Sequence, residues 1–542
     1  MSEVYRRLGE VLPPGHRAEP VFAVDGKRAA AWAEALPRAD AHATRRALLV
    51  ALEGLATQPL QKGAARHEVA DVLRPLVLEA AAFVERQTAG KPLPLAGELA
   101  ALPGELAQLH LRLAHAYRMA AADLCAPSGS LPWLRGGRVG EALARAVHHY
   151  VEAMRAAWRV YAELPPEAWR GLHRSLRFAE LRELDRRPVD DPLVPGQPSL
   201  HQAYVRVLLF ALCSPRAFSQ AEQERVWLMC EAFAPRSPLR EEPSGTSVGV
   251  AEDADEGPGG KAPARWHLDL VNFAAAVEAA LAAGGEDEAT VVPDHGMPVK
   301  FPVDGLRKLR RAFSQAASRQ FSRLEAGHRV ETVFGLSGLH FEASGGRDFD
   351  SFARHVLEGR IEEAQRAAWA SAGAENMART VRVPATVVDQ SLGGYRMRWA
   401  QDPQLRLRVG EVIGIQVAGE DEEADWMLGL LRWLRYEADG QVMAGVELLS
   451  RSAAAVALAG NAPSTRSPVR ALELRPPYGG NEWLYLTAQR LPQGETLHVG
   501  REQDEAERLL DARPGPTLKG LRLAQALGDY FLYRYTPADA PA

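Results

Sequence analysis

Apolar residues in the first half of the chain recur at the three- and four-residue spacing of helices that bury one face. Three stripes are clear: Val69, Val72, Leu73, Leu76, Phe83 and Val84; Leu106, Leu109, Leu113 and Tyr117; and Val147, Tyr150, Val151, Met154, Trp158 and Tyr161. Residues 204–213 are apolar on nearly every side, which predicts a central helix. No fixed repeat period is present, so a regular solenoid is not indicated. We predict a helical N-terminal domain over residues 1–236.

The composition then changes. Pro, Gly, Ser and acidic residues dominate residues 237–265, which predicts either a boundary loop or a hairpin around residues 247–250. Helical patterns resume at 268–283 and 303–318 and predict a helical connector over residues 266–318.

The second half changes to short apolar or alternating runs separated by polar, Gly-containing breaks. The runs are 381–388, 395–399, 405–409, 410–417, 426–433 and 442–448. This pattern is typical of a small antiparallel barrel. Further strand-like runs at 471–474, 483–486, 496–499 and 530–533 predict a C-terminal β-rich domain over residues 461–542. The fold class expected is α+β.

One turn between two of these runs combines a carboxylate, a hydroxyl and two glycines. It reads Asp389-Gln-Ser-Leu-Gly-Gly394, between a run that ends at Val388 and one that begins at Tyr395. Such a turn places its polar groups and exposed backbone amides at one sheet edge. D-x-S-x-x-G in this setting resembles the signature of the PilZ family of bacterial cyclic di-GMP receptors. The later runs, with Gly445-Val-Glu-Leu448 as the closing element, are similar to the family's pattern.

The second motif of the PilZ family is R-x-x-x-R, ahead of the first strand. Arg319-Gln-Phe-Ser-Arg323 has this spacing, and residues 329–334 follow as a possible first strand. This assignment requires a helical insertion at about 342–378 within a barrel spanning 319–460, with residues 349–374 as its helical part. Such an insertion is tolerable because loop-closure cost grows only logarithmically with length. Arg379 and Arg382 lie nearer the signature but lack the motif's spacing, and they remain the alternative pair.

The resemblance implies a ligand and a set of contacts. Cyclic di-GMP offers phosphates and guanine O6 and N7 acceptors, to which an Arg fork can donate bidentately. Arg319 and Arg323 would hold phosphate and guanine, and Asp389 and Ser391 would contact the opposite guanine edge. The site expected from the resemblance is Arg319, Arg323, Asp389, Ser391, Gly393 and Gly394, where Gly394 allows close backbone approach.

Composition narrows the class of protein. The 542 residues are 46% hydrophobic and 25% charged, with a net charge of −5 and no long Lys/Arg run. We therefore expect a soluble multidomain protein that binds neither DNA nor RNA. Cys125, Cys213 and Cys230 lack paired spacing and predict buried thiols in a reducing compartment. The sequence shows no signal peptide or membrane span, so a cytoplasmic location is expected.

Catalytic motifs are poorly supported. Glu141 opens an EAL motif, but within an Ala-rich helical stretch and without barrel strands around it. Residues 284–288 resemble a GGDEF cyclase signature that lacks its Phe, and a helix stop at Gly284 explains them better. No P-loop, H-E-x-x-H motif or nucleophile elbow is present. His110, His115, His148 and His149 lack metal-ligand spacing. We expect no enzyme, no catalytic residue, no metal and no cofactor.

These patterns predict a cyclic di-GMP-responsive regulator that passes ligand occupancy to a protein partner through its helical region. The alternative is an interaction or scaffold protein whose PilZ-like barrel has lost nucleotide binding, which the displaced arginine motif keeps open. The sequence identifies neither the partner nor the pathway, nor the oligomeric state or ligand stoichiometry.

Overall fold

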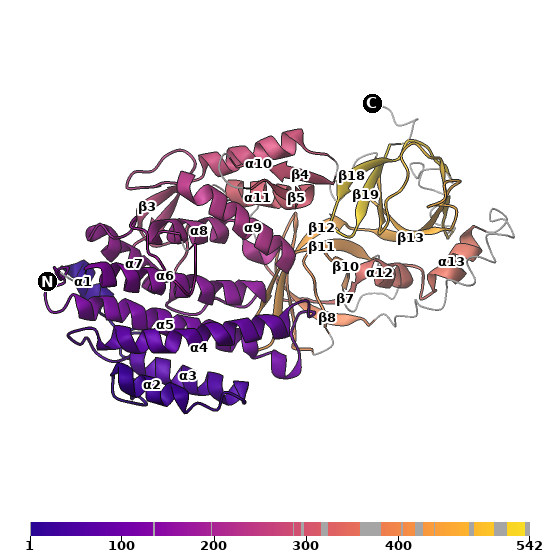
Figure 1. Ribbon diagram of the computed structural model, residues 1–542. Coiled ribbons are helices and arrows are strands. Elements are labelled where there is room, and N and C mark those ends of the chain that lie inside the picture. Colours follow the sequence, from indigo (N-terminus) through magenta and orange to yellow (C-terminus); the bar gives the residue numbers. More distant parts are fainter. Residues whose placement is uncertain are drawn as a thin grey trace. The chain divides into compact units, whose positions relative to one another are not determined.

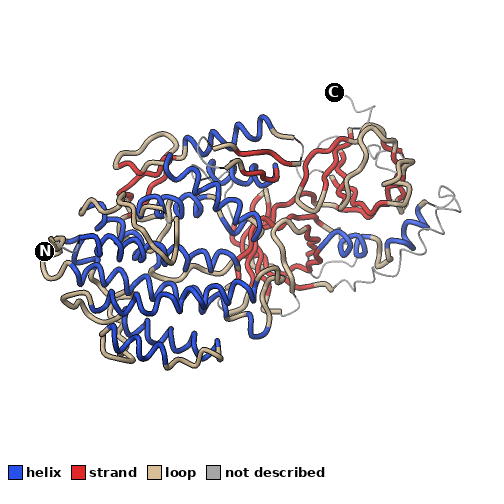
Figure 2. The backbone as a smooth tube through the Cα atoms, in the orientation of Figure 1, coloured by secondary structure: helices blue, strands red, loops and turns tan. Residues whose placement is uncertain are grey.

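A computed structural model describes residues 2–133, 136–196, 198–285, 287–293, 297–315, 324–357, 381–402, 405–417, 426–437, 439–475, 482–502 and 517–536. The chain divides into two compact units. The helical unit comprises Met1–Ala283, Thr290–Phe301 and Lys308–Ser318, and the β unit comprises Gly284–Ala289, Pro302–Arg307 and Arg319–Ala542. Helices dominate the first unit and strands the second, which confirms the α+β class (Figures 1 and 2).

The helical unit is built around two long, deeply buried helices, α5 and α6. Every residue of α5 from Leu113 to Leu124 is buried. Its helices are α1 (Glu3–Leu8), α2 (Gly26–Glu34), α3 (Ala41–Ala56), α4 (Ala65–Thr88), α5 (Leu102–Leu124), α6 (Gly136–Arg159), α7 (Ala168–Leu181), α8 (Leu200–Leu212) and α9 (Gln220–Phe233), with 3₁₀ turns at Gly97–Leu99, Pro215–Ala217 and Ala234–Arg236. The three predicted stripes lie on α4, α5 and α6, and the apolar run at 204–213 forms most of α8 and its C-cap.

Residues 237–265 hold β1 (Leu239–Arg240), β2 (Ser247–Ala251) and the start of β3 (Ala264–Asp269), which form a small sheet in the order β1-β3-β2. The acidic loop between β2 and β3 contacts helix α7. The Asp255 carboxylate accepts hydrogen bonds from the backbone N–H groups of Glu167 (2.6 Å) and Trp169 (3.1 Å) at the start of α7. Asp253 pairs with Arg174 of the same helix at 2.5 Å. The acidic composition therefore reflects helix capping and ion pairing inside the helical unit.

The stretch that leads toward the arginine motif contains α10 (Val271–Ala283), β4 (Glu288–Val291), β5 (Val299–Pro302) and α11 (Val303–Gln315). The two strands pair with each other as a two-stranded sheet. The sequence pattern indicates the two helices of this stretch but not the hairpin between them, because four-residue strands carry little periodicity.

The β unit begins with a closed antiparallel barrel. Its strands are β6 (Leu324–Glu325), β7 (Arg329–Phe334), β8 (Val383–Ser391), β9 (Gly394–Trp399), β10 (Val412–Val417), β11 (Met427–Tyr436) and β12 (Val442–Ser450). The neighbours run β6-β8-β7-β10-β11-β12-β9, and β9 pairs back onto β8, which closes the barrel. Trp399 is fully buried, and its indole N–H donates to the hydroxyl of Thr332 across the interior (3.1 Å).

One predicted barrel strand is wrong. Residues 405–409 alternate apolar and cationic side chains, yet in the structure they run as a loop into a turn. Leu405 and Leu407 are both buried. An extended loop with alternate side chains against the core has the same period as a strand, so the pattern does not separate the two.

Two helices interrupt the barrel between β7 and β8: α12 (Gly335–Ala343) and α13 (Phe349–Val356). Only α13 falls within the helical insertion expected at about 342–378, because α12 begins directly after β7 and ends at Ala343. Residues 358–380 lie outside the described part of the chain. Leu336 and Leu339 of α12 belong to one apolar cluster with barrel strands and C-terminal strands. Phe352 of α13 packs on Ala455 and Ala457.

The C-terminal strands form a second antiparallel sheet in the order β17-β16-β13-β14-β15-β19-β18. They are β13 (Ala453–Ala459), β14 (Val469–Leu474), β15 (Trp483–Thr487), β16 (Leu497–Gly500), β17 (Thr517–Leu518), β18 (Arg522–Ala526) and β19 (Phe531–Tyr535). β13 lies inside the range 319–460 expected for the barrel, but it pairs with β14 and β16 of this sheet. The four predicted C-terminal runs coincide with β14, β15, β16 and β19.

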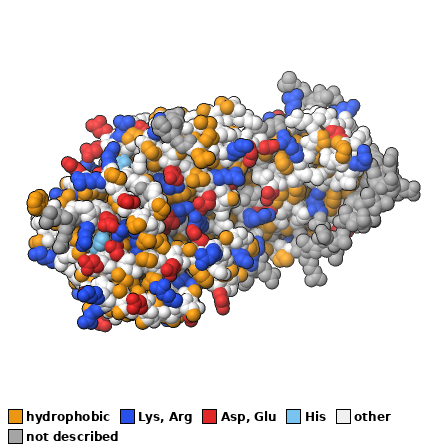
Figure 3. All heavy atoms as spheres, in the orientation of Figure 1, with side chains coloured by type: hydrophobic (Ala, Val, Ile, Leu, Met, Phe, Trp, Pro, Cys, Tyr) orange, Lys and Arg blue, Asp and Glu red, His pale blue; other side chains and the backbone are white. Residues whose placement is uncertain are grey.

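On the face shown in Figure 3, Lys and Arg side chains are interspersed with Asp and Glu. Among the described residues, no helix combines the length and apolar character that crossing a membrane requires.

Candidate functional site

The signature turn is the tip of the β8–β9 hairpin. Ser391 and Gly394 face each other as the last pair of the ladder, and Leu392 and Gly393 form the two-residue connection. The Ser391 hydroxyl donates to the Gly394 carbonyl at 3.3 Å. The backbone N–H of Leu448, on β12, donates to the Gly393 carbonyl at 3.0 Å. The tip is therefore fixed to the neighbouring strand as well as to its own hairpin.

Gly394 has a structural reason to be glycine. Its φ is +150°, and a Cβ added there would lie 1.9 Å from the Val446 carbonyl oxygen on β12. No side chain fits at that distance. The sequence suggests that Gly394 lets a ligand approach the backbone closely. In the structure, it is strand β12 that approaches the Gly394 backbone.

A β-bulge sets the direction of Asp389. The β8–β9 register shifts between Val387, which pairs with Met397, and Asp389, which pairs with Arg396. Val387 and Met397 are buried core residues, whereas Asp389 beyond the shift forms an ion pair with Arg396 (2.6 Å between Oδ2 and Nη2). An extra residue in one strand re-aims the side chains that follow it. The bulge thus directs Asp389 to the face that carries Arg396.

The chain segment that follows the predicted arginine motif lies beside Asp389. Leu324, directly after Arg323 in the sequence, pairs with Gln390, and Glu325 pairs with Asp389. The backbone N–H of Ala326 donates to the Val388 carbonyl (3.1 Å), which carries the pairing on toward β7. Arg319 and Arg323 themselves lie outside the described residues.

Arg382, one member of the alternative arginine pair, lies at the opposite end of β8. Arg382 precedes β8 by one residue and forms an ion pair with Glu342 of α12 (2.6 Å), while its guanidinium lies 5.4 Å from the centre of the Trp426 ring. Seven residues of extended chain separate Arg382 from Asp389, about 23 Å at the rise of a strand. Arg379 lies outside the described residues. Arg382 is thus engaged with other partners and remote from the signature.

The two motifs that resemble enzyme signatures lie in other settings. Glu141 is in the interior of α6 and pairs with Arg145 one turn later. Gly284 directly follows the last residue of α10, and Glu288 begins β4. Glu286 lies outside the described residues.

The histidines of α5 and α6 meet in the core. The Nδ1 atoms of His110 and His149 lie 2.9 Å apart, and burial lowers the pKa of His110 to about 4. His115 hydrogen-bonds the Tyr150 hydroxyl at 2.7 Å. In the part of the chain that the structure describes, no group of three or more His, Cys, Asp or Glu side chains is arranged to hold a metal. Cys125, Cys213 and Cys230 are buried free thiols.

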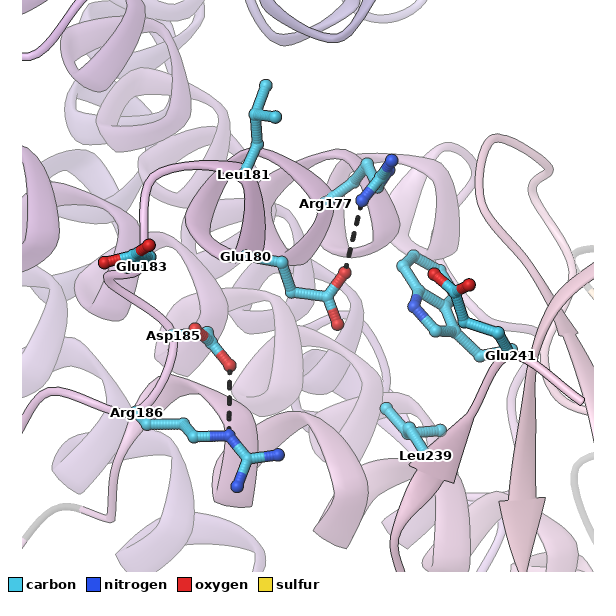
Figure 4. A pocket seen from close by; sticks show the side chains of 9 residues that line it. Arg177, Glu180, Leu181, Glu183, Asp185, Arg186, Leu239 and Glu241 are labelled. Carbon is cyan, nitrogen blue, oxygen red and sulfur yellow. Dashed lines mark ion pairs between the residues drawn. The ribbon is translucent and has the colours of Figure 1, made fainter.

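The helical unit also carries an open pocket of about 480 Å³ between the end of α7 and the small sheet (Figure 4). Four carboxylates line it: Glu180, Glu183, Asp185 and Glu241. Its two arginines pair with acids of the same wall, Arg177 with Glu180 (3.7 Å) and Arg186 with Asp185 (3.6 Å). Negative charge in excess opposes a ligand with two phosphates, so this pocket is the poorer candidate for a cyclic dinucleotide.

Arg396 was not among the predicted site residues, although the sequence carries a signal for it. In a hairpin with a two-residue turn, counting outward from Leu392 and Gly393 pairs Ser391 with Gly394, Gln390 with Tyr395, and Asp389 with Arg396. Turn length fixes the register of a hairpin.

A barrel closed by the six strands β7 to β12, with D-x-S-x-x-G at a hairpin tip, defines the class of protein, which is a PilZ-domain protein. Two family models match the chain: the N-terminal domain of the cyclic-di-GMP receptor FimW over residues 27–243, and its middle PilZ domain over 259–381 and 358–455. Together they span most of the chain, which therefore belongs to the FimW family of cyclic-di-GMP receptors. The middle-domain match is split into two pieces that overlap at 358–381, within and just after the predicted insertion.

A curated relative agrees with this assignment. The cyclic-di-GMP receptor FimW of Pseudomonas aeruginosa is 23% identical over 480 residues, covering 78% of this chain and 76% of the relative. The aligned length extends past either domain model taken singly, so the similarity concerns the multidomain protein and not only its barrel. The resemblance that the signature and barrel runs indicate is confirmed.

Proposed function

We propose that this chain binds cyclic di-GMP at the tip of the β8–β9 hairpin through Asp389, Ser391, Gly393 and Gly394, together with Arg319 and Arg323. Asp389 would accept from the N1–H and N2–H donors of one guanine. The arginines would donate to phosphate and to the guanine O6 and N7 acceptors. Ligand occupancy is passed to a protein partner through the helical region, in the bacterial cytoplasm and without chemical change to the ligand.

The observation that carries this proposal is the pairing of β6 with β8. It sets Leu324 and Glu325 against Gln390 and Asp389, so the backbone that follows Arg323 runs beside the signature. An Arg side chain spans about 6 Å from Cα to guanidinium, which is enough to reach a ligand held on the neighbouring strand. Arg382 is the poorer candidate for the ligand arginine, because it forms an ion pair with Glu342 at the end of β8 opposite Asp389.

Isothermal titration of the full chain with cyclic di-GMP tests the proposal. Arg323→Ala and Asp389→Ala should each weaken binding more than tenfold, since a charge-assisted hydrogen bond to a partly buried group contributes about 1.5–3 kcal/mol. Arg382→Ala is the matched control and should leave the affinity unchanged. Chromatography after incubation with Mg²⁺ should return the dinucleotide intact.

Two results would point elsewhere. Absence of binding by the unmodified chain would favour the interaction or scaffold protein with a PilZ barrel that no longer takes nucleotide. Loss of binding in Arg382→Ala or Arg379→Ala, with Arg323→Ala unaffected, would move the arginine assignment to the segment just before β8.

A further inference from the structure

Arg396 is the direct cross-strand neighbour of Asp389. Its guanidinium Nη2 lies 2.6 Å from the Asp389 Oδ2, and 38% of its side chain is exposed to solvent. Asp389 is only 6% exposed, so the pair presents a guanidinium to solvent above a largely covered carboxylate. The Arg396 Nε atom is buried and has no hydrogen-bond partner among the described residues.

Strand pairing places one acidic and one basic residue beside Asp389. On one side Asp389 pairs with Glu325 of β6, and on the other side with Arg396 of β9. Arg396 forms an ion pair with Asp389, so the two strands β8 and β9 present a carboxylate and a guanidinium next to each other.

An Asp–Arg pair of this kind also has a specific complement among the bases. Guanine displays N1–H and N2–H donors next to the O6 acceptor, with N7 beyond it, whereas adenine has an amino donor in the place of O6. A carboxylate can accept hydrogen bonds from the two donors, and a guanidinium beside it can donate to O6 and N7. Adenine in the same position would set its amino group against the guanidinium.

We propose that Arg396 is a third ligand arginine, which donates to the O6 and N7 edge of the guanine held by Asp389 and thereby selects guanine over adenine. This role rests on the proposed function, because it requires cyclic di-GMP at the hairpin. Arg396 adds two things that Arg319 and Arg323 do not. It fixes the Asp389 carboxylate from within the same hairpin, and it brings a donor to the base edge independently of the segment that precedes β6.

The affinities of cyclic di-GMP and cyclic di-AMP, the second measured by competition, test this role in the full chain. Arg396→Met should weaken cyclic di-GMP about tenfold or more and change cyclic di-AMP by less than about twofold, so that discrimination collapses. Arg398→Met is the matched control. Arg398 lies two residues along the same strand, is exposed, and pairs with Thr386 instead of the signature. It should keep both affinities.

Arg396→Lys distinguishes the loss of a ligand contact from a folding defect. It retains the charge but supplies one compact donor group instead of a fork, so its affinity for cyclic di-GMP should fall between those of the unmodified chain and Arg396→Met. An unchanged affinity in Arg396→Met, or an equal loss for both dinucleotides, would overturn the selective role while leaving the proposed function standing. An unmodified chain that binds neither dinucleotide would overturn both.

Discussion

Gly394 belongs to the D-x-S-x-x-G signature and is also required by the packing of the barrel. Its missing Cβ lets the hairpin tip approach the Val446 carbonyl of β12, and its φ of +150° is one that other residues rarely adopt. The last glycine of D-x-S-x-x-G is thus required for barrel closure in this chain, whatever its part in binding.

Gly394→Ala should destabilise the β unit by about 3 kcal/mol, because the added methyl meets backbone that cannot move without breaking the β9–β12 ladder. Urea denaturation and hydrogen exchange of the β8–β9 amides measure the effect. Gly327→Ala is the control, since a Cβ there meets no atom within 4 Å. Equal stability in the two variants would show that β12 can retreat from the hairpin.

At the scale of elements, α12 and α13 link the barrel to the C-terminal sheet. Leu336 and Leu339 pack in a cluster that includes Leu428 of the barrel and Leu472 of the C-terminal sheet. His340 hydrogen-bonds the Val456 carbonyl of β13 (3.3 Å) and makes edge-on contacts with the rings of Phe349 and Phe352. The insertion is therefore part of the core of the β unit.

His340 should make this core sensitive to acid. Burial, aided by the nearby Arg470, lowers its pKa to about 4, below the usual value of about 6.5 for an unfolded imidazole. Between these values the unfolded chain binds the proton and the folded chain does not, so stability falls as pH drops from about 6.5 to about 4. The largest loss from this group is about 3 kcal/mol.

Denaturation of the full chain with His340→Gln should show a shallower loss of stability over that pH range, since the Gln amide can donate to Val456 but does not titrate. His498→Gln, at an exposed position of β16, is the matched control and should keep the slope of the unmodified chain. If the free energy of unfolding fell equally steeply with pH in all three proteins, protonation of His340 would not contribute to the loss of stability.

For the molecule as a whole, the proposed function requires a connection between the hairpin and the helical unit. The chain itself offers one connection, because α11 leads in sequence to Arg319 and Arg323, and β6 then runs beside the signature. A ligand can shift the equilibrium between two arrangements only through its different affinity for them. Contact with residues on both sides of this connection would supply such a difference.

Cyclic di-GMP should therefore increase protection from hydrogen exchange at residues 319–329 and at positions within the helical unit. Exchange followed by mass spectrometry, with and without ligand, measures both regions. Asp389→Ala at the same ligand concentration is the control and should lack both effects. Protection confined to the residues around Asp389 would describe a binding module without a switch.

Features that depend on residues close together in the chain could be predicted from the sequence. The helical stripes, most barrel runs and the signature hairpin are periodic or turn-based patterns, which a few consecutive residues specify. Asp389, Ser391 and Gly394 could be proposed as site residues for the same reason, because a two-residue turn sets Ser391 opposite Gly394 locally. Counting residue pairs outward from the turn would also have predicted that Arg396 lies opposite Asp389. The β-bulge that changes the direction of the Asp389 side chain could not be predicted in this way.

Contacts between residues distant in sequence could not be predicted in this way, because they depend on how the whole chain folds. The pairing of β6 with the end of β8, the approach of β12 to Gly394, and the packing of α12 against two sheets all join such segments. The loop at 405–409 imitates a strand. Of the two alternatives for 237–265, the hairpin around 247–250 matches the pairing of β2 with β3, but the contacts of its acidic loop with α7 were not predictable from the sequence. Local periodicity records which side chains are buried, but strand register, closure and ion-pair partners follow from the packing that minimises exposed apolar surface across the whole unit.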